Sequence, residues 1–428
     1  MGVESTSHSV IESLPVWGLP SDGPIIDCVS PSDRLHNPRV IAGTTVGFEG
    51  LQRFRSRVID PLRNLLPMAV EVEAVPSETR ETIVTALEAR GFFIHEEEAE
   101  SARRGHLILA GTLDRFDLLR GLRDVPPDFA ELAASIVRAV DARFQDEFEV
   151  PTARAPLRLG RRPLVMGILN VTPDSFSDGG RFEKPDVAIA HAFDMVDEGA
   201  DLIDVGAEST RPGAPPVTAD EEVARLEPIV KVLGESLPVP LSVDTRKAEV
   251  ADRMLGLGAA LINDVSGLEH DPRLAEVVAR RGGALVLNHI RGTPQTMQES
   301  PRYDDAAAEI CRSLRERLER AGRAGVPDDR VILDPGIGFG KRLEDNLEVL
   351  ARLSEFRSLG RPLLVGCSRK SFLGLLTGRA PDERSAATAA TTALLAGRGV
   401  KMVRVHEVRE TVDVLKVLDA IDGRLSMA

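Results

Sequence analysis

The sequence predicts an α/β protein, a (β/α)8 TIM barrel preceded by a small α+β N-terminal domain. Three observations support this. From residue 164 onward, eight short apolar runs alternate with stretches of helical periodicity, which is the pattern of a parallel sheet crossed by helices. The runs are evenly spaced over roughly 265 residues, as closure into a barrel requires. Polar side chains gather where the runs end.

The chain divides into three parts. Its 428 residues are too many for one average domain, and two fit better. The stretch "EVPTARAPLRLGRRP", 149–163, holds three prolines and four arginines with little apolar periodicity, which is typical of a connection between domains. We therefore assign residues 1–150 to the N-terminal domain, 151–161 to a linker and 162–428 to the barrel domain.

The N-terminal domain carries no recognisable chemistry. Segments 49–66 and 127–144 have helical periodicity, whereas "AVEVEAV" (69–75) and "HLILAG" (106–111) have the composition of strands. These residues contain no phosphate loop, metal cluster or acid/base motif, so the sequence assigns this domain no role.

The predicted strands and helices of the barrel alternate along the chain. The strands are the runs 164–169, 201–206, 240–244, 260–264, 284–289, 331–336, 362–366 and 401–405. The helical patterns include 187–199, 221–237, 247–257, 304–324, 343–359 and 407–421. An open, doubly wound sheet is the alternative arrangement of such units.

Most of the apolar runs end in or next to a polar side chain. The carboxyl ends of barrel strands meet at one face, where active sites lie, so these side chains should converge. They are Asn170, Asp204, Asp244, Asn263, Asp264, His289, Asp334, Ser368, Arg369, Lys370, Arg404 and His406. Strand ends that simply meet solvent would not need so many different groups.

Composition excludes several classes of protein. Lys and Arg number 53 against 67 Asp and Glu, a net charge of −14, which argues against general nucleic-acid binding. We expect no membrane span, because no apolar run reaches about 18 residues, and the N-terminus lacks the pattern of a secretory signal. Cys28, Cys311 and Cys367 are far apart and lack metal-ligand spacing, which suits a reducing cytoplasm.

Two loops at the expected barrel mouth contain residues that could bind a ligand. The loop "DPGIGFGK", 334–341, lacks the spacing of a P-loop or a dinucleotide fingerprint. Its alternating glycines instead allow backbone to approach a flat ligand, with Phe339 as a wall. The loop "AESTRPGAPP", 207–216, places Arg211 among prolines, where it is either an anion clamp or a solvated side chain.

Together these groups indicate a nitrogen heterocycle that carries a phosphate. The cationic side chains that suit phosphate are Arg211, Arg404 and His406. Asn170 adds an oxygen ligand for a hard cation, and Mg²⁺ usually bridges phosphates. The acceptors that suit a ligand rich in N–H donors are Asp244, Asn263 and Asp334.

Eight motifs resemble those of dihydropteroate synthase, an enzyme family of folate synthesis. In order they are "MGILNVTPDSFSDGG", "ESTRPGA", "SVDTRK", "IND", "RGTPQTMQ", "LDPGIGFGK", "GCSRKSFLG" and "VRVHEV". Some are weak alone, but eight in sequence make a specific match that covers about residues 162–428. The resemblance implies a (β/α)8 transferase. It would condense 6-hydroxymethyl-7,8-dihydropterin diphosphate with 4-aminobenzoate, giving 7,8-dihydropteroate and diphosphate, with Mg²⁺.

The resemblance also implies roles for individual side chains. The pterin would be held by Asp244, Asn263, Asp334, Lys370 and Arg404. The diphosphate would be held by Asn170, Arg211, Arg404 and His406, with Asn170 as the metal ligand. The 4-aminobenzoate site would be formed by Phe176, Thr210, Pro212, Gly338, Phe339, Lys370 and Ser371, and sulfonamides should compete there. The catalytic set would be Asp244, Lys370, Arg404 and His406.

The polar, glycine-hinged loop after the first strand, within "NVTPDSFSDGG" (170–180), fits this interpretation. We expect it to close over the leaving group, with Phe176 covering the aromatic amine. A surface loop with Phe176 in the core is the alternative.

A few positions depart from the family pattern. Asn288 and Ile290 stand where methionines usually flank the histidine, and Cys367 replaces an apolar residue. Cys367 is either a reactive thiol or a small buried residue. Two other functions stay open. A methyltetrahydrofolate:corrinoid methyltransferase would not need the diphosphate clamp, and an inactive pterin-binding paralogue would not need the full set of charged residues.

The stretch "SAATAATTALLAG", 385–397, is rich in small residues that permit close helix packing. Helices late in the barrel form a homodimer in the family, and packing on the barrel itself is the alternative. We therefore expect small-molecule substrates and a homodimer, with neither nucleic acid nor membrane as a partner.

Overall fold

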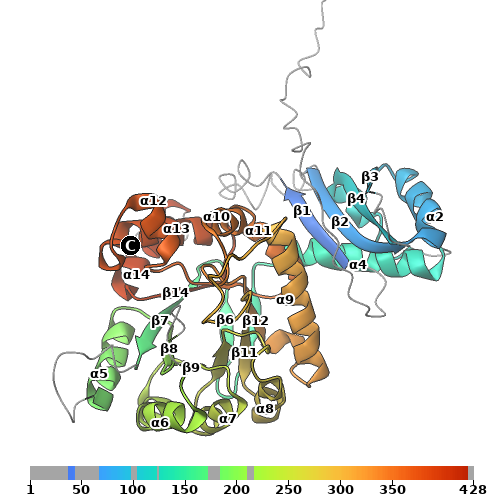
Figure 1. Cartoon of the computed structure of the whole chain (residues 1–428). Helices are drawn as coiled ribbons and strands as arrows, with labels where there is room; N and C mark the ends of the chain where they lie inside the picture. Colours follow the sequence, from blue (N-terminus) through green and yellow to red (C-terminus); the bar gives the residue numbers. More distant parts are fainter. Residues whose placement is uncertain are drawn as a thin grey trace, which may run out of the picture.

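Eight parallel strands form the centre of the larger part of the chain (Figure 1). The computed structural model describes residues 37–43, 67–97, 104–122, 125–171, 184–209 and 216–422. The strands are β7 (Leu164–Asn170), β8 (Leu202–Gly206), β9 (Leu241–Asp244), β10 (Leu261–Asp264), β11 (Ala284–Asn288), β12 (Val331–Asp334), β13 (Leu364–Val365) and β14 (Met402–Val405).

The sheet closes on itself. Its order is β12-β11-β10-β9-β8-β7-β14-β13, and a parallel bridge between Leu333 and Leu363 joins β12 to the segment that enters β13. The backbone N–H of Leu333 also donates to the carbonyl of Pro362 at 3.0 Å. The predicted barrel is therefore confirmed, and the open, doubly wound sheet is wrong.

Helices surround the barrel and follow its strands in sequence. They are α5 (Lys184–Asp197), α6 (Ala219–Ser236), α7 (Ala248–Gly256), α8 (Arg273–Arg281), α9 (Ala306–Arg323), α10 (Leu343–Ala351), α11 (Leu353–Phe356), α12 (Ser371–Thr377), α13 (Ser385–Gly397) and α14 (Val408–Ile421). The pattern predicted over 343–359 is divided into α10, α11 and a 3₁₀ turn, Arg357–Leu359. Helix α8 was not among the predicted patterns.

Side chains alternate along each strand between two apolar layers, as strand geometry requires. Val165 and Val205 belong to the layer between strands and helices. Met166 and Leu202 belong to a separate cluster inside the barrel. The inward positions nearest the carboxyl ends of the strands are polar, so that end of the barrel can bind a polar ligand.

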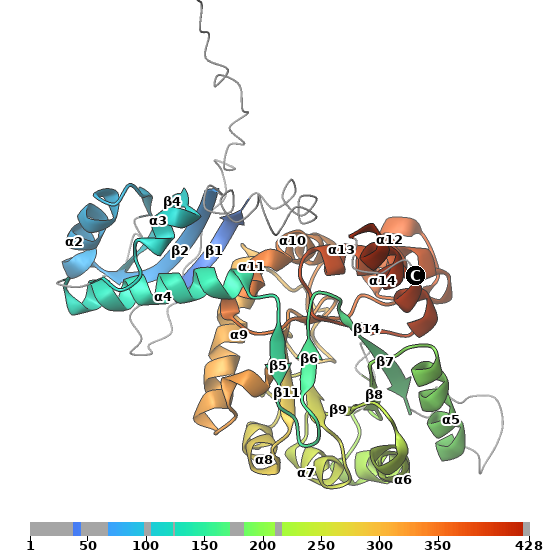
Figure 2. The same cartoon turned by 180° about the vertical axis from the view of Figure 1, so that it is seen from behind.

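A β-hairpin closes the opposite end of the barrel. Strands β5 (Phe148–Val150) and β6 (Leu157–Leu159) pair antiparallel, and Figure 2 shows them beside the barrel strands. Val150, Leu157 and Leu159 are buried in the same cluster as Met166 and Leu202. The segment 151–161 expected as a linker therefore contains a strand that packs on the barrel interior. Leu157 and Leu159 alternate with Arg158, and flanking prolines and arginines mask this short pattern.

The N-terminal part is a four-stranded antiparallel sheet with helices, as the α+β prediction required. The strands, in the order β1-β2-β4-β3, are β1 (Asn37–Gly43), β2 (Pro67–Pro76), β4 (Arg104–Thr112) and β3 (Phe93–Glu97). The helices are α2 (Ser77–Glu88), α3 (Leu113–Asp117) and α4 (Pro127–Phe144). Val70, Leu109, Phe129 and Ile136 lie in its own core. The helix predicted over 49–66 lies outside the described residues.

Helix α4 connects the two parts and packs beside α11 (Figures 1 and 2). Arg357 pairs with Asp146 at 2.8 Å and donates to the carbonyl of Gln145 at 2.9 Å. None of the helices in the described residues is long and apolar enough to cross a membrane.

Candidate active site

The polar side chains predicted to converge do lie at one rim. Strand register places Asn170 beside Gly206, Gly206 beside Asp244, and Asp244 beside Asn263. Farther round the barrel, Asn288 lies beside Asp334. Because all these strands are parallel, their carboxyl ends open on the same side.

A buried carboxylate organises the floor of this rim. Asp204 of β8 has no exposed surface. Its Oδ2 accepts a hydrogen bond from Nε of Arg404 at 2.7 Å and another from Nδ2 of Asn263 at 3.0 Å. A buried charge requires such partners, so Asp204 holds two of the predicted pterin-binding side chains in place.

Arg404 bridges a second carboxylate. Its Nη2 lies 3.0 Å from Oδ2 of Asp244, which is partly exposed to the barrel mouth. Burial raises the pKa of Asp244 to about 7, although the Arg404 guanidinium opposes the shift. Asp204 and Asp244 are therefore two carboxylates that share one arginine, and the outer one can change its charge near neutral pH.

Asp334 ends β12 and begins the glycine-rich loop. Its Oδ1 accepts the N–H of Gly336 at 2.7 Å, whereas Oδ2 accepts no hydrogen bond from the described residues. Gly336 has φ of +71°, and a Cβ there would lie 1.9 Å from the carbonyl oxygen of His289. Only glycine fits this turn, which presents the carboxylate of Asp334 to the rim. Burial raises the pKa of Asp334.

Lys370 contacts the same loop. Its Nζ donates to the carbonyl of Ile337 and lies 4.0 Å from the centre of the Phe339 ring, a cation–π contact. Burial lowers the pKa of Lys370 to about 8, although Asp334 opposes the shift. Gly338 has φ of +83°, which favours glycine, and a Cβ there would lie 2.9 Å from Cδ of Lys370.

The turn before Lys370 aims its side chain inward. Arg369 has φ of +58°, which non-glycine residues rarely adopt. Its carbonyl accepts from Arg384 at 2.8 Å, and its guanidinium pairs with Glu407. These contacts hold the turn, and Ser371 then begins α12 with an exposed side chain.

His406 is oriented by neighbours in the segments that follow β13 and β14. Its Nδ1 lies 2.8 Å from Oγ of Ser368, and that hydroxyl donates to Oε2 of Glu407 at 2.9 Å. Burial opposes ionisation of Glu407, but hydrogen bonds from Arg369 and Ser368 lower its pKa. Because the hydroxyl has one proton and a carboxylate only accepts, Nδ1 of His406 must carry a proton.

Part of the predicted site cannot be placed. Phe176, Thr210, Arg211 and Pro212 lie outside the described residues. Glu208, just before this gap, accepts the N–H of Val217 at 3.2 Å. It also pairs with Arg246 at 2.9 Å and with Lys247 at 2.7 Å.

The positions that depart from the family are buried. Asn288 donates through Nδ2 to the carbonyl of Val265 at 2.9 Å, and Ile290 is buried beside it. Cys367 is buried, and burial raises the pKa of its thiol to about 12. Because the thiolate is the reactive form, the small buried role is confirmed and the reactive thiol is wrong.

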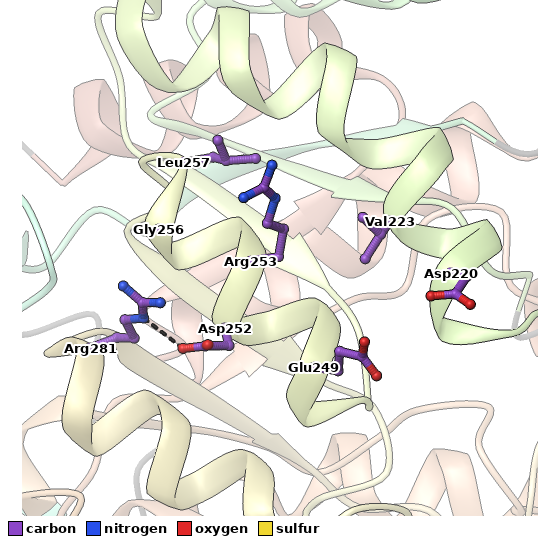
Figure 3. A pocket seen from close by; sticks show the side chains of 8 residues that line it. All are labelled: Asp220, Val223, Glu249, Asp252, Arg253, Gly256, Leu257 and Arg281. Carbon is purple, nitrogen blue, oxygen red and sulfur yellow. Dashed lines mark hydrogen bonds and ion pairs between the residues drawn. The ribbon is translucent and has the colours of Figure 1, made fainter.

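A groove on the outer ring of helices is separate from this rim. It has a volume of about 480 Å³ and is lined by residues of α6, α7 and α8 and of the turn after α7 (Figure 3). Among its charged side chains, Asp252 pairs with Arg281 at 2.6 Å, and Arg253 pairs with Glu227 outside the groove. These exposed ion pairs, away from the strand ends, do not form a catalytic site.

The described part of the rim offers few oxygen ligands to a metal ion, which suits a cation held mainly by the phosphates of a bound substrate. The described residues contain no group of three His, Cys, Asp or Glu side chains that could hold a metal ion. Asn170, exposed at the end of β7, offers one amide oxygen. Mg²⁺ commonly takes one or two protein oxygens and completes its shell with phosphates and water, so this arrangement suits it.

Sequence reasoning did not assign roles to four side chains that organise the site. They are Asp204, Lys341, Ser368 and Glu407. Each stands inside or next to one of the eight motifs or at a strand end. Their partners, however, are distant in sequence or come close only through the conformation of a turn. Asp204 and Arg404, for example, are 200 residues apart.

The chain is similar to known pterin-binding proteins. Residues 166–406 match the family described as "Pterin binding enzyme". The dihydropteroate synthase of Escherichia coli strain K12 is 46% identical over 258 residues, 60% of this chain and 91% of the relative.

Two solved structures are similar as well. The dihydropteroate synthase of Xanthomonas albilineans, solved with 4-aminobenzoic acid, is 46% identical with a TM-score of 0.59, covering 62% of this chain and 95% of its own. That of Burkholderia cenocepacia, complexed with 7,8-dihydropteroate, is 43% identical with a TM-score of 0.59, covering 64% and 97%.

Proposed function

Because this chain belongs to the dihydropteroate synthase family of transferases, we propose that it condenses 6-hydroxymethyl-7,8-dihydropterin diphosphate with 4-aminobenzoate. The products are 7,8-dihydropteroate and diphosphate. One observation carries the proposal: Asp244 and Asp334 lie at the same barrel rim as Lys370 and Arg404, and their charges act on one another. Such a rim offers acceptors to the heterocycle and donors to its leaving group.

The pterin binds between the carboxylates and Lys370. Oδ2 of Asp334 and the amide of Asn263 face donors and acceptors on the edge of the ring. A carboxylate that accepts two parallel N–H bonds recognises an amino-pyrimidinone edge. Asp204 does not touch the ligand in this proposal; it fixes Arg404 and Asn263 through the hydrogen bonds at 2.7 and 3.0 Å.

The diphosphate lies on the cationic side of the rim. His406 and Arg404 contact its oxygens, and Arg211 adds a third cation from the neighbouring loop. Asn170 would hold Mg²⁺ through its amide oxygen. When bound, the ion neutralises charge on the leaving diphosphate. Arg404 still has N–H groups for phosphate, because Asp204 and Asp244 use only one donor on Nε and one on Nη2.

The substitution is dissociative. The bond between the pterin methylene carbon and the diphosphate oxygen breaks first, and Arg404 and His406 stabilise the charge on the departing oxygens. Asp244, when ionised, stabilises the positive charge that spreads over the ring. The neutral amine of 4-aminobenzoate then forms the new C–N bond and loses a proton to solvent, so no strong base is required.

The second substrate lies against the glycine-rich loop. Phe339 forms an apolar wall, and Lys370 lies 4.0 Å over that ring. Gly338 leaves room for the lysine chain, because a Cβ at this position would lie 2.9 Å from Cδ of Lys370. Ser371 and Lys370 meet the carboxylate of 4-aminobenzoate, and Thr210, Pro212 and Phe176 complete the site. Sulfonamides compete for the same place.

The last helices of the barrel form a homodimer contact. Large apolar side chains are exposed there: Leu375 and Leu376 on α12, Leu394 on α13, and Val417 and Ile421 on α14. Apolar side chains clustered on one face of a protein commonly mark an interface. Light scattering should give the mass of a dimer for the wild type and the mass of a monomer for Leu394→Glu. The same mass for both proteins would count against the contact.

One assay tests the function. Release of diphosphate from the pterin substrate is followed with and without 4-aminobenzoate. Release that depends on 4-aminobenzoate supports the synthase. Pterin binding without release supports an inactive paralogue, and methyl transfer from a methylated folate without diphosphate release supports the corrinoid methyltransferase.

A further inference from the structure

A second lysine is buried under the glycine-rich loop. Lys341, the last residue of that loop, is 3% exposed. Its Nζ lies 2.7 Å from the carbonyl oxygen of Gly336 and 3.1 Å from that of Phe339. It also lies 3.0 Å from Nδ1 of His289. Burial lowers the pKa of Lys341 well below its usual range. The amino group has three N–H donors when charged and two when neutral, and these contacts occupy them in either state.

His289, one partner of Lys341, is suited to accept a hydrogen bond. Burial, with the charge of Lys341 next, holds the pKa of His289 well below its usual range, so the imidazole is neutral. A neutral imidazole has one nitrogen that accepts, and Nδ1 faces the lysine. Lys341 therefore has no donor left for a substrate.

The two lysines differ in the donors that remain. The described contacts of Lys370 use one donor, to the carbonyl of Ile337. The described contacts of Lys341 join its amino group to three partners: the carbonyls of Gly336 and Phe339, and the ring of His289. Both contact backbone carbonyls of the glycine-rich loop, but only Lys370 has donors to offer a ligand.

The glycine-rich loop needs side-chain hydrogen bonds to hold its backbone in one conformation. Gly336, Gly338 and Gly340 all have positive φ, of +71°, +83° and +62°. Glycine backbone has more conformational freedom to lose than any other residue, so alternating glycines do not hold one shape alone. Lys341 bonds the carbonyls of Gly336 and Phe339, which bracket Gly338.

We propose that Lys341 is a positioning residue for the 4-aminobenzoate site, acting through the carbonyls of Gly336 and Phe339 to fix the Phe339 wall and the backbone that Lys370 contacts. The proposal rests on the function proposed above. It assigns Lys341 to the binding of the second substrate rather than to the pterin, because its bonds bracket the part of the loop beyond Asp334.

The test compares Lys341→Met with a matched control, Lys401→Met. Lys401 is also 3% exposed, and its Nζ donates to the carbonyl of Gly160 at 3.1 Å, near the hairpin at the other end of the barrel. Both variants remove a buried amino group. KM for each substrate and kcat are measured for both, after circular dichroism establishes that they fold.

Lys341→Met should raise KM for 4-aminobenzoate about tenfold or more, because small misplacements at a reacting site are costly. KM for the pterin diphosphate should change by less than about threefold, and Lys401→Met should leave both values near those of the wild type. Equal rises in both KM values, or unchanged values in folded Lys341→Met, would overturn the proposal. A wild type without turnover dependent on 4-aminobenzoate would instead overturn the proposed function.

A second pair of variants covers the case in which Lys341→Met does not fold. His289→Leu removes one acceptor of Lys341, whereas His289→Asn places an amide oxygen, which can accept, close to the position of Nδ1. His289→Leu should raise KM for 4-aminobenzoate selectively, and His289→Asn should restore it. The same KM in both variants would contradict the role of Lys341.

Discussion

Nε of Arg404 lies 2.7 Å from Oδ2 of Asp204, a carboxylate without exposed surface. This bond joins the last strand of the barrel to its second strand, at the base of the rim. The side chain that contacts the diphosphate in our proposal is therefore positioned by a residue that no ligand needs to touch.

Asp204→Ala should leave Arg404 and Asn263 without this acceptor. Breaking a buried charge pair costs about 3 kcal/mol or more, so the free energy of unfolding in urea should fall by that amount. The value of kcat/KM should also fall, by about tenfold or more, because the guanidinium loses its orientation. Asp252→Ala, which removes an exposed partner of Arg281, should change both far less. Equal losses in the two variants would contradict the role of Asp204.

The pH dependence of turnover follows from Asp244 and Lys370. Burial raises the pKa of Asp244 to about 7 and lowers the pKa of Lys370 to about 8. Because the mechanism needs ionised Asp244 and protonated Lys370, kcat/KM should fall below about pH 7 and above about pH 8. Asp244→Asn should be slow at every pH and lose the acidic limb. An acidic limb that persists in this variant would exclude Asp244 as its source.

Stability should respond to the same carboxyl group. Asp244 titrates higher in the folded state than in the unfolded chain, where its pKa is about 3.9. The folded state then binds more protons between about pH 3.9 and pH 7. This contribution to stability is complete below about pH 3.9 and is lost as pH rises toward 7. Urea unfolding across this window should show a smaller loss for Asp244→Asn than for the wild type, after the shared trend is subtracted.

Asn170 should set the magnesium requirement. Asn170→Ala removes an amide oxygen at the end of β7, so more Mg²⁺ should be needed for half-maximal turnover, by roughly tenfold. Asn170→Asp keeps an oxygen and should retain a low requirement. A metal titration of Asn170→Ala that coincides with that of the wild type would count against the metal role.

The β5–β6 hairpin should be part of the barrel's folding unit. Val150, Leu157 and Leu159 are buried against barrel residues, and each such side chain contributes about 1.5–3 kcal/mol. A chain of residues 162–428 should therefore be less stable in urea than one of residues 145–428 by about 4 kcal/mol or more. Equal midpoints would show that the hairpin is dispensable.

Much of the fold could be predicted because each barrel strand is short, apolar and followed by a helical pattern. The eight strands begin and end within about two residues of prediction, within the usual uncertainty of element boundaries. The hairpin was missed because only two alternating leucines mark β6, among arginines and prolines. Helix α8 was overlooked although its buried residues, Leu274, Ala275, Val277 and Val278, have helical spacing.

The site was predictable where a motif presents its functional group directly, as with Asp334 and Lys370. It was not predictable where one side chain acts through another. The bond from Arg404 to Asp204 spans 200 residues, and the three contacts of Lys341 depend on the detailed course of a glycine turn. Closure of the barrel creates both, so sequence spacing alone does not reveal them.

Calorimetric titration of the pterin substrate into Asp334→Asn tests the central claim most directly. The substitution keeps the shape of the side chain but replaces a carboxylate oxygen by an N–H donor, so affinity should fall about 100-fold or more. Asp345→Asn, which alters an equally hidden carboxylate on α10 that pairs with Arg342, should keep the affinity of the wild type. A folded Asp334→Asn that binds the pterin as tightly as the wild type would contradict the assignment of this rim to the heterocycle.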